Sequence, residues 1–229
     1  MRLRCLTDKG GVRKENQDNY WSVIAKVDGR DCGVVCLCDG MGGLKNGGDA
    51  SKIAVNSVRR YVTKNFDFVG LKSVIEQANS SIYSIGGDSR DSMMGTTCTV
   101  LMCEDGVYRI LHVGDTRVYL LRNGNSYRLT DDHSAVSEFK IDKVKDPVLW
   151  KKYRNKLTRC LGAKSTVVVE EYTGRYLDGD VFLVCSDGCW HLFDEEPLTL
   201  SSIGNLESLF SRCKMSGETD NITACVLSV

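Results

Sequence analysis

The sequence predicts an α+β fold, a β-sandwich of two antiparallel sheets flanked by α-helices in four layers, α-β-β-α. Three observations lead to this prediction. The apolar runs rich in β-branched residues are short, the turns between several of them are tight, and two consecutive amphipathic segments interrupt the series. Short strands with tight turns favour antiparallel pairing, and amphipathic helices need a sheet to cover.

The strand predictions rest on alternating or continuous apolar patterns. They cover residues 20–24, 34–38, 97–103, 108–113, 117–122, 167–172, 181–185 and 222–229. The segments EDG at 104–106 and RNGN at 122–125 have the composition of hairpin turns. We therefore expect residues 97–129 to form one antiparallel meander.

The helix predictions rest on apolar side chains at helical spacing. In residues 49–64 the apolar stripe comprises Ala50, Ile53, Ala54, Val58, Tyr61 and Val62. Directly afterwards the same spacing recurs at Leu71, Val74, Ile75, Ala78 and Ile82. These two helices are expected to cover one face of the sandwich.

The bulk composition favours one soluble domain spanning residues 1–229. The chain has two prolines, no repeat and a formal net charge of zero with a pI of about 6.8. Such a balance provides no electrostatic attraction to nucleic acid or to an anionic membrane, so neither is expected as a partner. No apolar stretch approaches the roughly 20 residues that span a bilayer, and the opening MRLRCLTDKGG is too polar for a secretory signal. A cytoplasmic location is predicted.

Cysteine is frequent, with eleven residues, an odd number. Most of them lie inside apolar runs, where a thiol behaves as a small hydrophobic group. Cys36 and Cys38 share a face of their predicted strand, but no matching Cys or His cluster in the sequence completes a zinc site. We interpret the cysteines as free structural thiols in a reducing compartment.

Five aspartates lie at the ends of predicted strands. Asp39 in VVCLCDGMGG and Asp187 in FLVCSDGCW each end an apolar run and precede a glycine. Asp18, Asp115 and Asp220 also lie where apolar runs begin or end. If these ends converge, their like charges require cations, and oxygen ligands favour Mg²⁺ or Mn²⁺. Two such ions about 3.5–4 Å apart would activate water for in-line attack on phosphorus.

A phosphate would also need a positive partner. Arg13 stands in the same polar segment as Asp18, and a guanidinium can bind a phosphate through two hydrogen bonds.

The order of the motifs then identifies a family resemblance. The motifs are GVRKENQD, CDGMGG, GTTCTVLM, LHVGDTRVYLLR, LTDDHS, LTRCLG, LVCSDG and DNITACVLSV. Together they resemble the type 2C metal-dependent protein phosphatases, the PPM family, and most of all its compact bacterial branch. The resemblance extends from about residue 11 to residue 229. It implies a two-sheet sandwich with outer helices, and hydrolysis of phosphoserine or phosphothreonine in proteins.

The resemblance also implies roles for individual residues. Asp39 would bridge two core metal ions, the Gly40 carbonyl would bind one of them, and Asp187 and Asp220 would bind the other. Asp18 falls where the family holds metal-bound water, and Asp115 would help to bind a third, weaker ion together with Asp187. Arg13 matches the phosphate-binding arginine.

Two positions depart from the eukaryotic pattern. Met41 stands where eukaryotic members usually carry the histidine proposed to protonate the leaving group, so water on a metal ion is expected to supply that proton. Gln17 replaces a common glutamate, which removes one negative charge from the site. Both variants are similar to the bacterial pattern and do not imply inactivity.

Residues 140–155, KIDKVKDPVLWKKYRN, correspond to the family's flap beside the active site. The segment carries six basic residues and two aspartates. It is either a solvated face or a surface that attracts acidic or phosphorylated substrate segments. An unchanged KM for a phosphoprotein at low salt after neutralising Lys151 and Lys152 would exclude the second interpretation.

The leading prediction is therefore a Mn²⁺- or Mg²⁺-dependent serine/threonine phosphatase, monomeric, whose partners are phosphorylated proteins and a cognate Ser/Thr kinase. Two alternatives remain. One is a phospho-binding pseudophosphatase, which would be expected to lack one of Asp39, Asp187 and Asp220; all three are present. The other is a phosphate monoesterase acting on small molecules.

Overall fold

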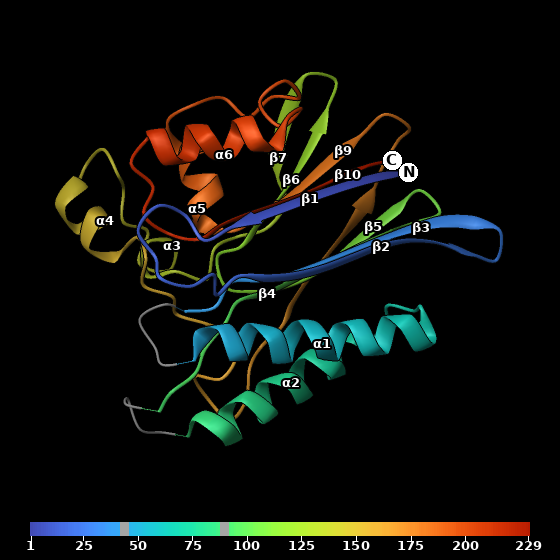
Figure 1. The fold of residues 1–229 in the computed structure, drawn as a ribbon, viewed down its shortest axis with the longest axis horizontal. Helices are drawn as coiled ribbons and strands as arrows, with labels where there is room; N and C mark the ends of the chain where they lie inside the picture. Colours follow the sequence, from blue (N-terminus) through green and yellow to red (C-terminus); the bar gives the residue numbers. More distant parts are fainter. Residues whose placement is uncertain (42–45, 88–91) are drawn as a thin grey trace.

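Two five-stranded antiparallel sheets form the centre of the molecule. The structure is a computed structural model that describes residues 1–41, 46–87 and 92–229. One sheet has the strand order β1-β10-β9-β6-β7 and the other β2-β3-β4-β5-β8. Figure 1 shows the two sheets face to face, with helices on the outer side of each. The predicted α-β-β-α sandwich is confirmed.

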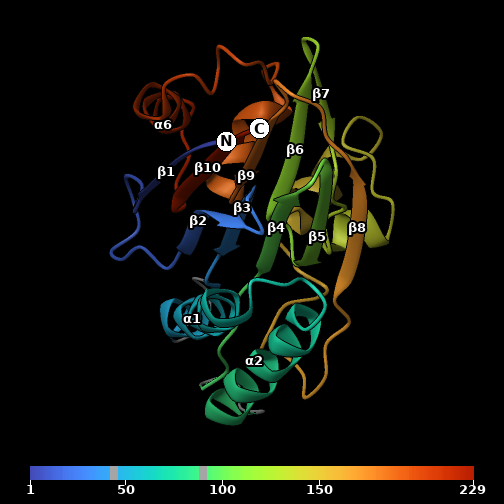
Figure 2. The same ribbon diagram turned by 90° about the vertical axis from the view of Figure 1, so that its right-hand side faces the viewer.

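Strands from distant parts of the chain pair in both sheets. The strands of the first sheet are β1 (Arg2–Asp8), β6 (Arg117–Arg122), β7 (Asn125–Arg128), β9 (Val181–Cys185) and β10 (Ile222–Ser228). Those of the second are β2 (Asn19–Val27), β3 (Arg30–Cys38), β4 (Cys98–Glu104), β5 (Val107–Val113) and β8 (Glu170–Arg175). Because β1 pairs with β10, with Arg2 opposite Ser228, the two termini lie side by side (Figures 1 and 2).

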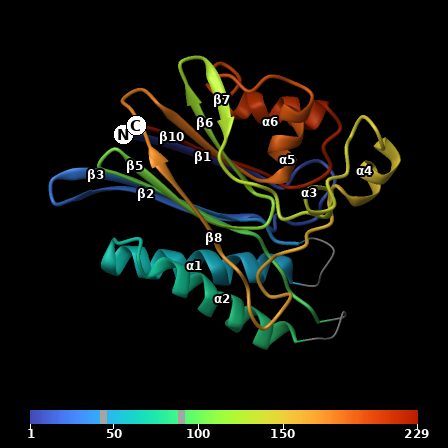
Figure 3. The same cartoon turned by 180° about the vertical axis from the view of Figure 1, so that it is seen from behind.

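The helices lie on the two outer faces and at one end. They are α1 (Gly47–Asn65), α2 (Leu71–Gly86), α3 (Ala135–Glu138), α4 (Pro147–Tyr153), α5 (Asp187–Trp190), which continues into a 3₁₀ turn at His191–Asp194, and α6 (Leu206–Met215). Helices α1 and α2 cover the second sheet and α6 covers the first, while α4 projects beyond the sandwich (Figure 3). None of the helices described is both long and apolar enough to cross a membrane.

Three hydrophobic clusters fill the spaces between these layers. One packs the inner faces of both sheets around Leu37, Leu101 and Phe182, all 0% exposed. A second lies between the second sheet and helices α1 and α2, and a third between the first sheet and helices α5 and α6. The alternation along each strand therefore sends side chains to two different cores, which explains why the central strands are almost continuously apolar.

The predicted meander over residues 97–129 was wrong at its centre. The hairpins β4–β5 and β6–β7 form, with positive φ angles at both residues of each turn. However, β5 pairs with β8 and β6 pairs with β9, so the chain changes sheet between Val113 and Arg117. Two hairpins in succession look alike in sequence whether or not they share a sheet.

Some elements lie outside the sequence prediction. The edge strand β1 and helix α6 were not predicted, β7 was implied only by the expected meander to residue 129, and β8 begins three residues later than expected. Both edge strands have many exposed or half-exposed positions, so they lack a clear apolar signal. Val167 and Val169 pack against the core beneath α1 and α2 before the strand begins, which shifted the expected boundary.

Candidate active site

The aspartates predicted from the sequence converge at the end of the sandwich opposite the β2–β3 hairpin. Asp39 follows β3, Asp187 begins α5 just after β9, and Asp220 precedes β10. A cavity of about 210 Å³ opens between these ends. It is lined by Arg13, Asp39, Gly40, Met41, Thr97, Asp115, Asn155, Leu157, Asp187 and Asp220. Six of the seven predicted site residues therefore line one cavity, and the seventh, Asp18, lies buried behind it.

Backbone contacts between β3 and β4 hold Asp39 in place. The Asp39 amide donates to Thr97 Oγ1 at 2.8 Å, and the Thr97 amide donates to the Asp39 carbonyl at 2.9 Å. Thr96 Oγ1 donates to the same carbonyl at 2.9 Å. At Gly40 a Cβ atom would lie 2.5 Å from the Gly47 carbonyl oxygen, so only glycine fits there. The remaining glycines of the CDGMGG motif, Gly42 and Gly43, lie outside the described residues.

Asp18 is 4% exposed and is held by two hydroxyl groups from the first sheet. Ser186 Oγ and Thr223 Oγ1 donate to Asp18 Oδ2 at 2.8 and 2.6 Å. The other oxygen, Oδ1, is buried without a hydrogen-bond partner, as is Asp187 Oδ1. Two orphaned carboxylate oxygens at one place indicate that a positive ligand belongs there.

Asn221 secures the loop that carries Arg13. Its Nδ2 donates to the carbonyls of Lys9 and Glu15, both at 2.9 Å, and its Oδ1 accepts from the Gln17 amide at 2.9 Å. Arg13 Nη2 in turn donates to Asp220 Oδ2 at 2.5 Å. The guanidinium thus faces the carboxylates across the cavity.

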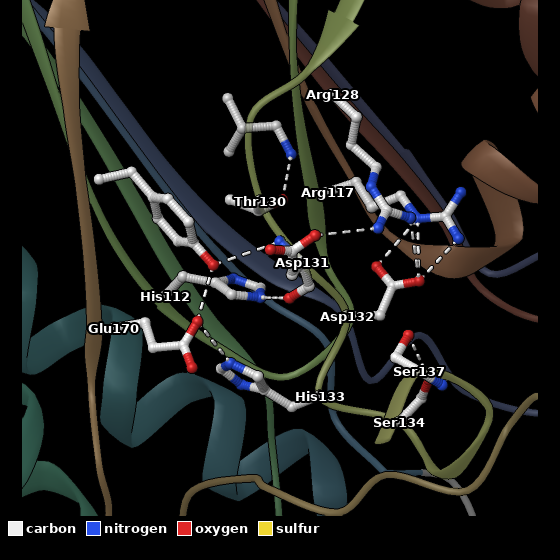
Figure 4. Close-up of polar contacts among 12 residues, drawn as sticks. His112, Arg117, Arg128, Thr130, Asp131, Asp132, His133, Ser134, Ser137 and Glu170 are labelled. Carbon is white, nitrogen blue, oxygen red and sulfur yellow. Dashed lines mark hydrogen bonds and ion pairs between the residues drawn. The ribbon is translucent and has the colours of Figure 1, made fainter. Parts of the chain in front are cut away.

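Asp115 lies where the chain changes sheet, and a polar network holds this crossing (Figure 4). Gly114 has a φ of +114°, and a Cβ there would lie 2.5 Å from Thr97 Cγ2. The Gly114 amide donates to His133 Nδ1 at 2.9 Å, and the His133 amide donates back to the Gly114 carbonyl at 2.8 Å. Because Nδ1 accepts, Nε2 carries the hydrogen and faces Glu170 Oε2 at 3.1 Å.

The other side of the crossing is held by a buried ion pair. Arg117, 8% exposed, donates to both oxygens of Asp132, which is 9% exposed, and its guanidinium lies 3.4 Å from the centre of the Trp190 ring. Trp190 Nε1 donates to the Asp115 carbonyl at 2.9 Å. The LTDDHS motif, quoted above only for its resemblance, therefore positions Asp115.

Burial and the charges of neighbouring carboxylates raise the pKa values of several aspartates in the cavity, which is typical of a site that binds cations. Burial, reinforced by nearby carboxylates, raises the pKa of Asp187 to about 8 and that of Asp115 to about 7. Burial raises the pKa of Asp18 to about 6 despite its hydroxyl partners. Burial and the surrounding carboxylates of Asp18, Asp187, Asp115 and Asp220 raise the pKa of Asp39 well above its usual value.

The residues present fit divalent metal ions of the hard class. Carboxylate and carbonyl oxygens supply the donor set, and among the described residues that line the cavity there is no histidine or cysteine that would favour zinc. The two orphaned oxygens of Asp18 and Asp187 are acceptors without a donor. Arg13 supplies only one compensating charge to this group.

The stability of the metal-free protein should fall as the pH rises. Asp18, Asp115 and Asp187 have pKa values above the ordinary 3.8 in the folded state, so between pH 4 and pH 8 the folded chain binds more protons than the unfolded chain. The free energy of unfolding therefore decreases with pH across that window. Urea unfolding of EDTA-treated protein at about pH 5 and about pH 8 measures this. Equal or greater stability at the higher pH would contradict it.

A family model described as Protein phosphatase 2C matches residues 12–223. The chain belongs to the protein phosphatase 2C family. The resemblance noted in the sequence is thereby confirmed, and the enzyme class is that of a protein phosphatase.

Relatives of this phosphatase family match the chain along its whole length. Protein phosphatase PhpP of Streptococcus pneumoniae serotype 2 is 30% identical over 243 residues, covering 100% of this chain and 98% of its own. The crystal structure of the PPM Ser-Thr phosphatase MsPP from Mycobacterium smegmatis in complex with cacodylate has a TM-score of 0.80 at 26% identity, covering 100% of this chain and 98% of that one.

A further solved structure of a phosphatase of this kind contains metal. The catalytic domain of serine threonine protein phosphatase PstP in complex with two manganese ions has a TM-score of 0.77 at 25% identity. It covers 98% of this chain and 96% of that one.

Several residues of the site were not predicted from the sequence. Ser186 and Thr223 hold Asp18, Asn221 holds the Arg13 loop, and His133 and Asp132 hold the loop that carries Asp115. Each is a polar residue inside or beside an apolar run. That position in the sequence is the only feature that could have marked these residues as part of the site. Their partners lie up to 212 residues away in the chain, as for Asn221 and Lys9, so the contacts could not be read from spacing.

Proposed function

We propose that this phosphatase hydrolyses phosphoserine and phosphothreonine in proteins with the help of two Mn²⁺ or Mg²⁺ ions. The observation that carries the proposal is the pair of buried, unpartnered oxygens on Asp18 and Asp187, next to a cavity in which Arg13 faces further carboxylates. A site so rich in negative charge accepts a phosphate only when cations are bound. The manganese reported for PstP supports this choice of metal.

We assign the ion ligands by chemistry and position in the cavity. Asp39 and the Gly40 carbonyl, from the second sheet, face Asp187 and Asp220, from the first, so ions between them would be held from both sides. Asp115 with Asp187 would hold a third, weaker ion. Asp18, buried behind the cavity, would contribute its negative charge to the site. When bound, such a metal pair supplies activation of water and neutralisation of charge on the phosphoryl group.

Arg13 is proposed to bind the phosphate. In the structure Arg13 pairs with Asp220, and this pair raises the pKa of Arg13 above its ordinary value. Cations at the aspartates would replace Arg13 as the partner of Asp220, leaving the guanidinium free for two hydrogen bonds to phosphate oxygens. The Asn221 contacts keep its loop at the rim of the cavity.

Replacing Arg13 with alanine should lower kcat/KM for a phosphothreonine peptide by about 10–100-fold, because a hydrogen bond to a charged group is lost at the phosphate. We expect most of the loss in KM. Lys14→Ala is the matched control, since this neighbouring residue is exposed and lies outside the cavity lining. Equal kinetics for the two variants would refute a phosphate-binding role for Arg13.

Once the aspartates of the cavity bind cations, none of the described lining residues is left to act as an acid toward the leaving group. Met41 cannot donate a proton, and none of the lining residues is a histidine. We propose that water in the cavity protonates the departing serine or threonine oxygen. Asn155 and Leu157, which follow α4, line the cavity, and we propose that they contact the substrate chain.

We further propose that residues 1–229 act as one catalytic domain in the cytoplasm, as a monomer, within signal transduction that a cognate Ser/Thr kinase initiates. The eleven cysteines are all free of disulfide bonds, which suits a reducing compartment. The names of the relatives, Ser/Thr phosphatases of bacteria, support a phosphoprotein substrate. The basic residues of the flap around α4 would favour acidic segments next to the phosphorylated residue.

The test measures phosphate release from a phosphothreonine peptide and from a sugar phosphate at equal concentration. We expect turnover of the peptide with Mn²⁺, none with EDTA, and much weaker turnover of the sugar phosphate. Faster turnover of the sugar phosphate would favour the small-molecule monoesterase. Metal-loaded, folded protein that turns over neither substrate but binds the peptide would favour a phospho-binding module.

A further inference from the structure

Three cysteine side chains meet in the core between the second sheet and helix α1. Cys36 and Cys38 lie on one face of β3, and Cys98 is the first residue of the neighbouring strand β4. The strands pair with Leu37 opposite Thr99, and this register continued by one residue places Cys38 opposite Cys98. All three residues are 0% exposed, and their sulfur atoms lie within 4.8 Å of one another. The matching thiol that the sequence did not reveal therefore comes from the adjacent strand.

We propose that these three thiols form a binding site for a trivalent thiophilic ion, with arsenic(III) as its test ligand. Arsenic(III) keeps a lone pair, so three sulfur atoms bound at about 2.3 Å form a trigonal pyramid with it and would lie about 3.5 Å apart. The three sulfur atoms already lie within 4.8 Å of one another, so a modest approach of the two strand ends would complete the site. Zinc is a poorer fit, because it takes four ligands and no fourth ligand joins the three in the part of the chain that the structure describes.

The net charge of the complex favours a trivalent ion over a divalent or monovalent one. The three cysteines belong to a cluster of buried apolar residues that includes Ala50 and Ala54 of α1 and Val100 of β4. A net charge in such surroundings is costly. Three thiolates and one trivalent ion sum to zero, whereas Zn²⁺ would leave one negative charge and Cu⁺ two. A neutral complex is therefore the one that this core accepts.

The reaction balances without an oxidant or a reductant. Arsenous acid, As(OH)₃, is itself neutral and can enter an apolar core when it opens. Three As–O bonds break and three As–S bonds form, while each thiol proton leaves with a hydroxide as water. Because all three thiols are fully buried, binding requires a local opening of the core and should be slow.

Occupation of the site should disturb the catalytic cavity. Cys38 immediately precedes Asp39, and Cys98 immediately follows Thr97, so two of the thiols flank the hydrogen bonds that position Asp39. Drawing the sulfur atoms onto one ion shifts the ends of β3 and β4 together. We expect arsenic-loaded protein to lose phosphatase activity at the rate at which arsenic binds.

The experiment uses the full chain with its thiols reduced, incubated with arsenite. X-ray absorption at the arsenic edge should show three sulfur neighbours, and mass spectrometry should show a gain of one arsenic with the loss of three hydrogens. Proteolysis of the loaded protein should yield arsenic linking peptides that contain Cys36, Cys38 and Cys98. Arsenic bound by fewer than three sulfurs, arsenic on peptides of Cys185, Cys189 or Cys213, or no binding at all would overturn the proposal.

Substitution provides an independent test. Cys98→Ala should weaken arsenite binding at least about tenfold, because a chelating ligand is lost. Cys32→Ala is the matched control: it is also 0% exposed, lies on the same face of β3, and is outside the three-thiol group. Equal weakening in both variants would overturn the assignment. If Cys98→Ala fails to fold, the sulfur count and the peptide map of the unaltered protein decide the question.

Discussion

Replacing Asp39 with asparagine should lower kcat for a phosphothreonine peptide by roughly 10³-fold, comparable with the loss of one preorganised charge-stabilising group. The same substitution should raise the melting temperature of the metal-free protein by a few degrees. Asp39 is surrounded by four other aspartates, and its pKa is raised well above the usual value by burial and by their charges. A neutral amide of the same shape removes that repulsion.

These opposite effects separate a functional carboxylate from a structural one. Thermal unfolding with EDTA and with Mn²⁺, together with phosphate release, measures both. Asp49→Asn is the control, since Asp49 is an exposed residue of α1 whose contact with Lys52 is 4.0 Å long. A metal-free Asp39→Asn protein less stable than the original, or one that retains full turnover, would contradict the role proposed for Asp39.

The largest loss of stability is expected for Asp132→Ala. Arg117 is buried, and both oxygens of Asp132 accept its hydrogen bonds at 2.7–3.2 Å (Figure 4). Burial alone would lower the pKa of Arg117, but the hydrogen bonds and charges of Asp132 and Tyr119 together outweigh it, and the pKa is raised. Removing one partner of a buried pair leaves an uncompensated charge and costs about 3–5 kcal/mol. For a chain of this size that corresponds to a melting temperature lower by about 10 °C.

Asp131 provides the matched control one residue away. Its side chain is 82% exposed, and its contact with Arg128 is a surface pair at 3.3 Å. Asp131→Ala should therefore change the free energy of unfolding by less than about 1 kcal/mol. Urea unfolding of both variants provides the comparison. A similar small loss for Asp132→Ala would show that the remaining partners of Arg117, Asp194 and Tyr119, suffice to compensate its charge.

Patterns of neighbouring residues predicted most of the helices, strands and turns. Helices α1 and α2, most central strands and both hairpin turns follow from apolar spacing and turn residues, because these signals lie within the segment that forms each element. The edge strand β1 was missed because each of its positions is exposed or only half-buried, so no apolar run marks it. The division of β5 and β6 between two sheets was missed because hairpin signals do not specify which strands pair next.

The same division holds for the site. The chain on its own specified the chemistry: aspartates at strand ends, an arginine in the first polar loop and the ordered motifs of one phosphatase family. Only the folded chain brought Ser186 and Thr223 to Asp18, Asn221 to the Arg13 loop, and Cys98 to Cys36 and Cys38. Residue types and local periodicity are written along the chain, whereas contacts between distant strands depend on sheet pairing and register. Pairing and register depend on how all the layers bury their apolar faces together, and no single segment contains that information.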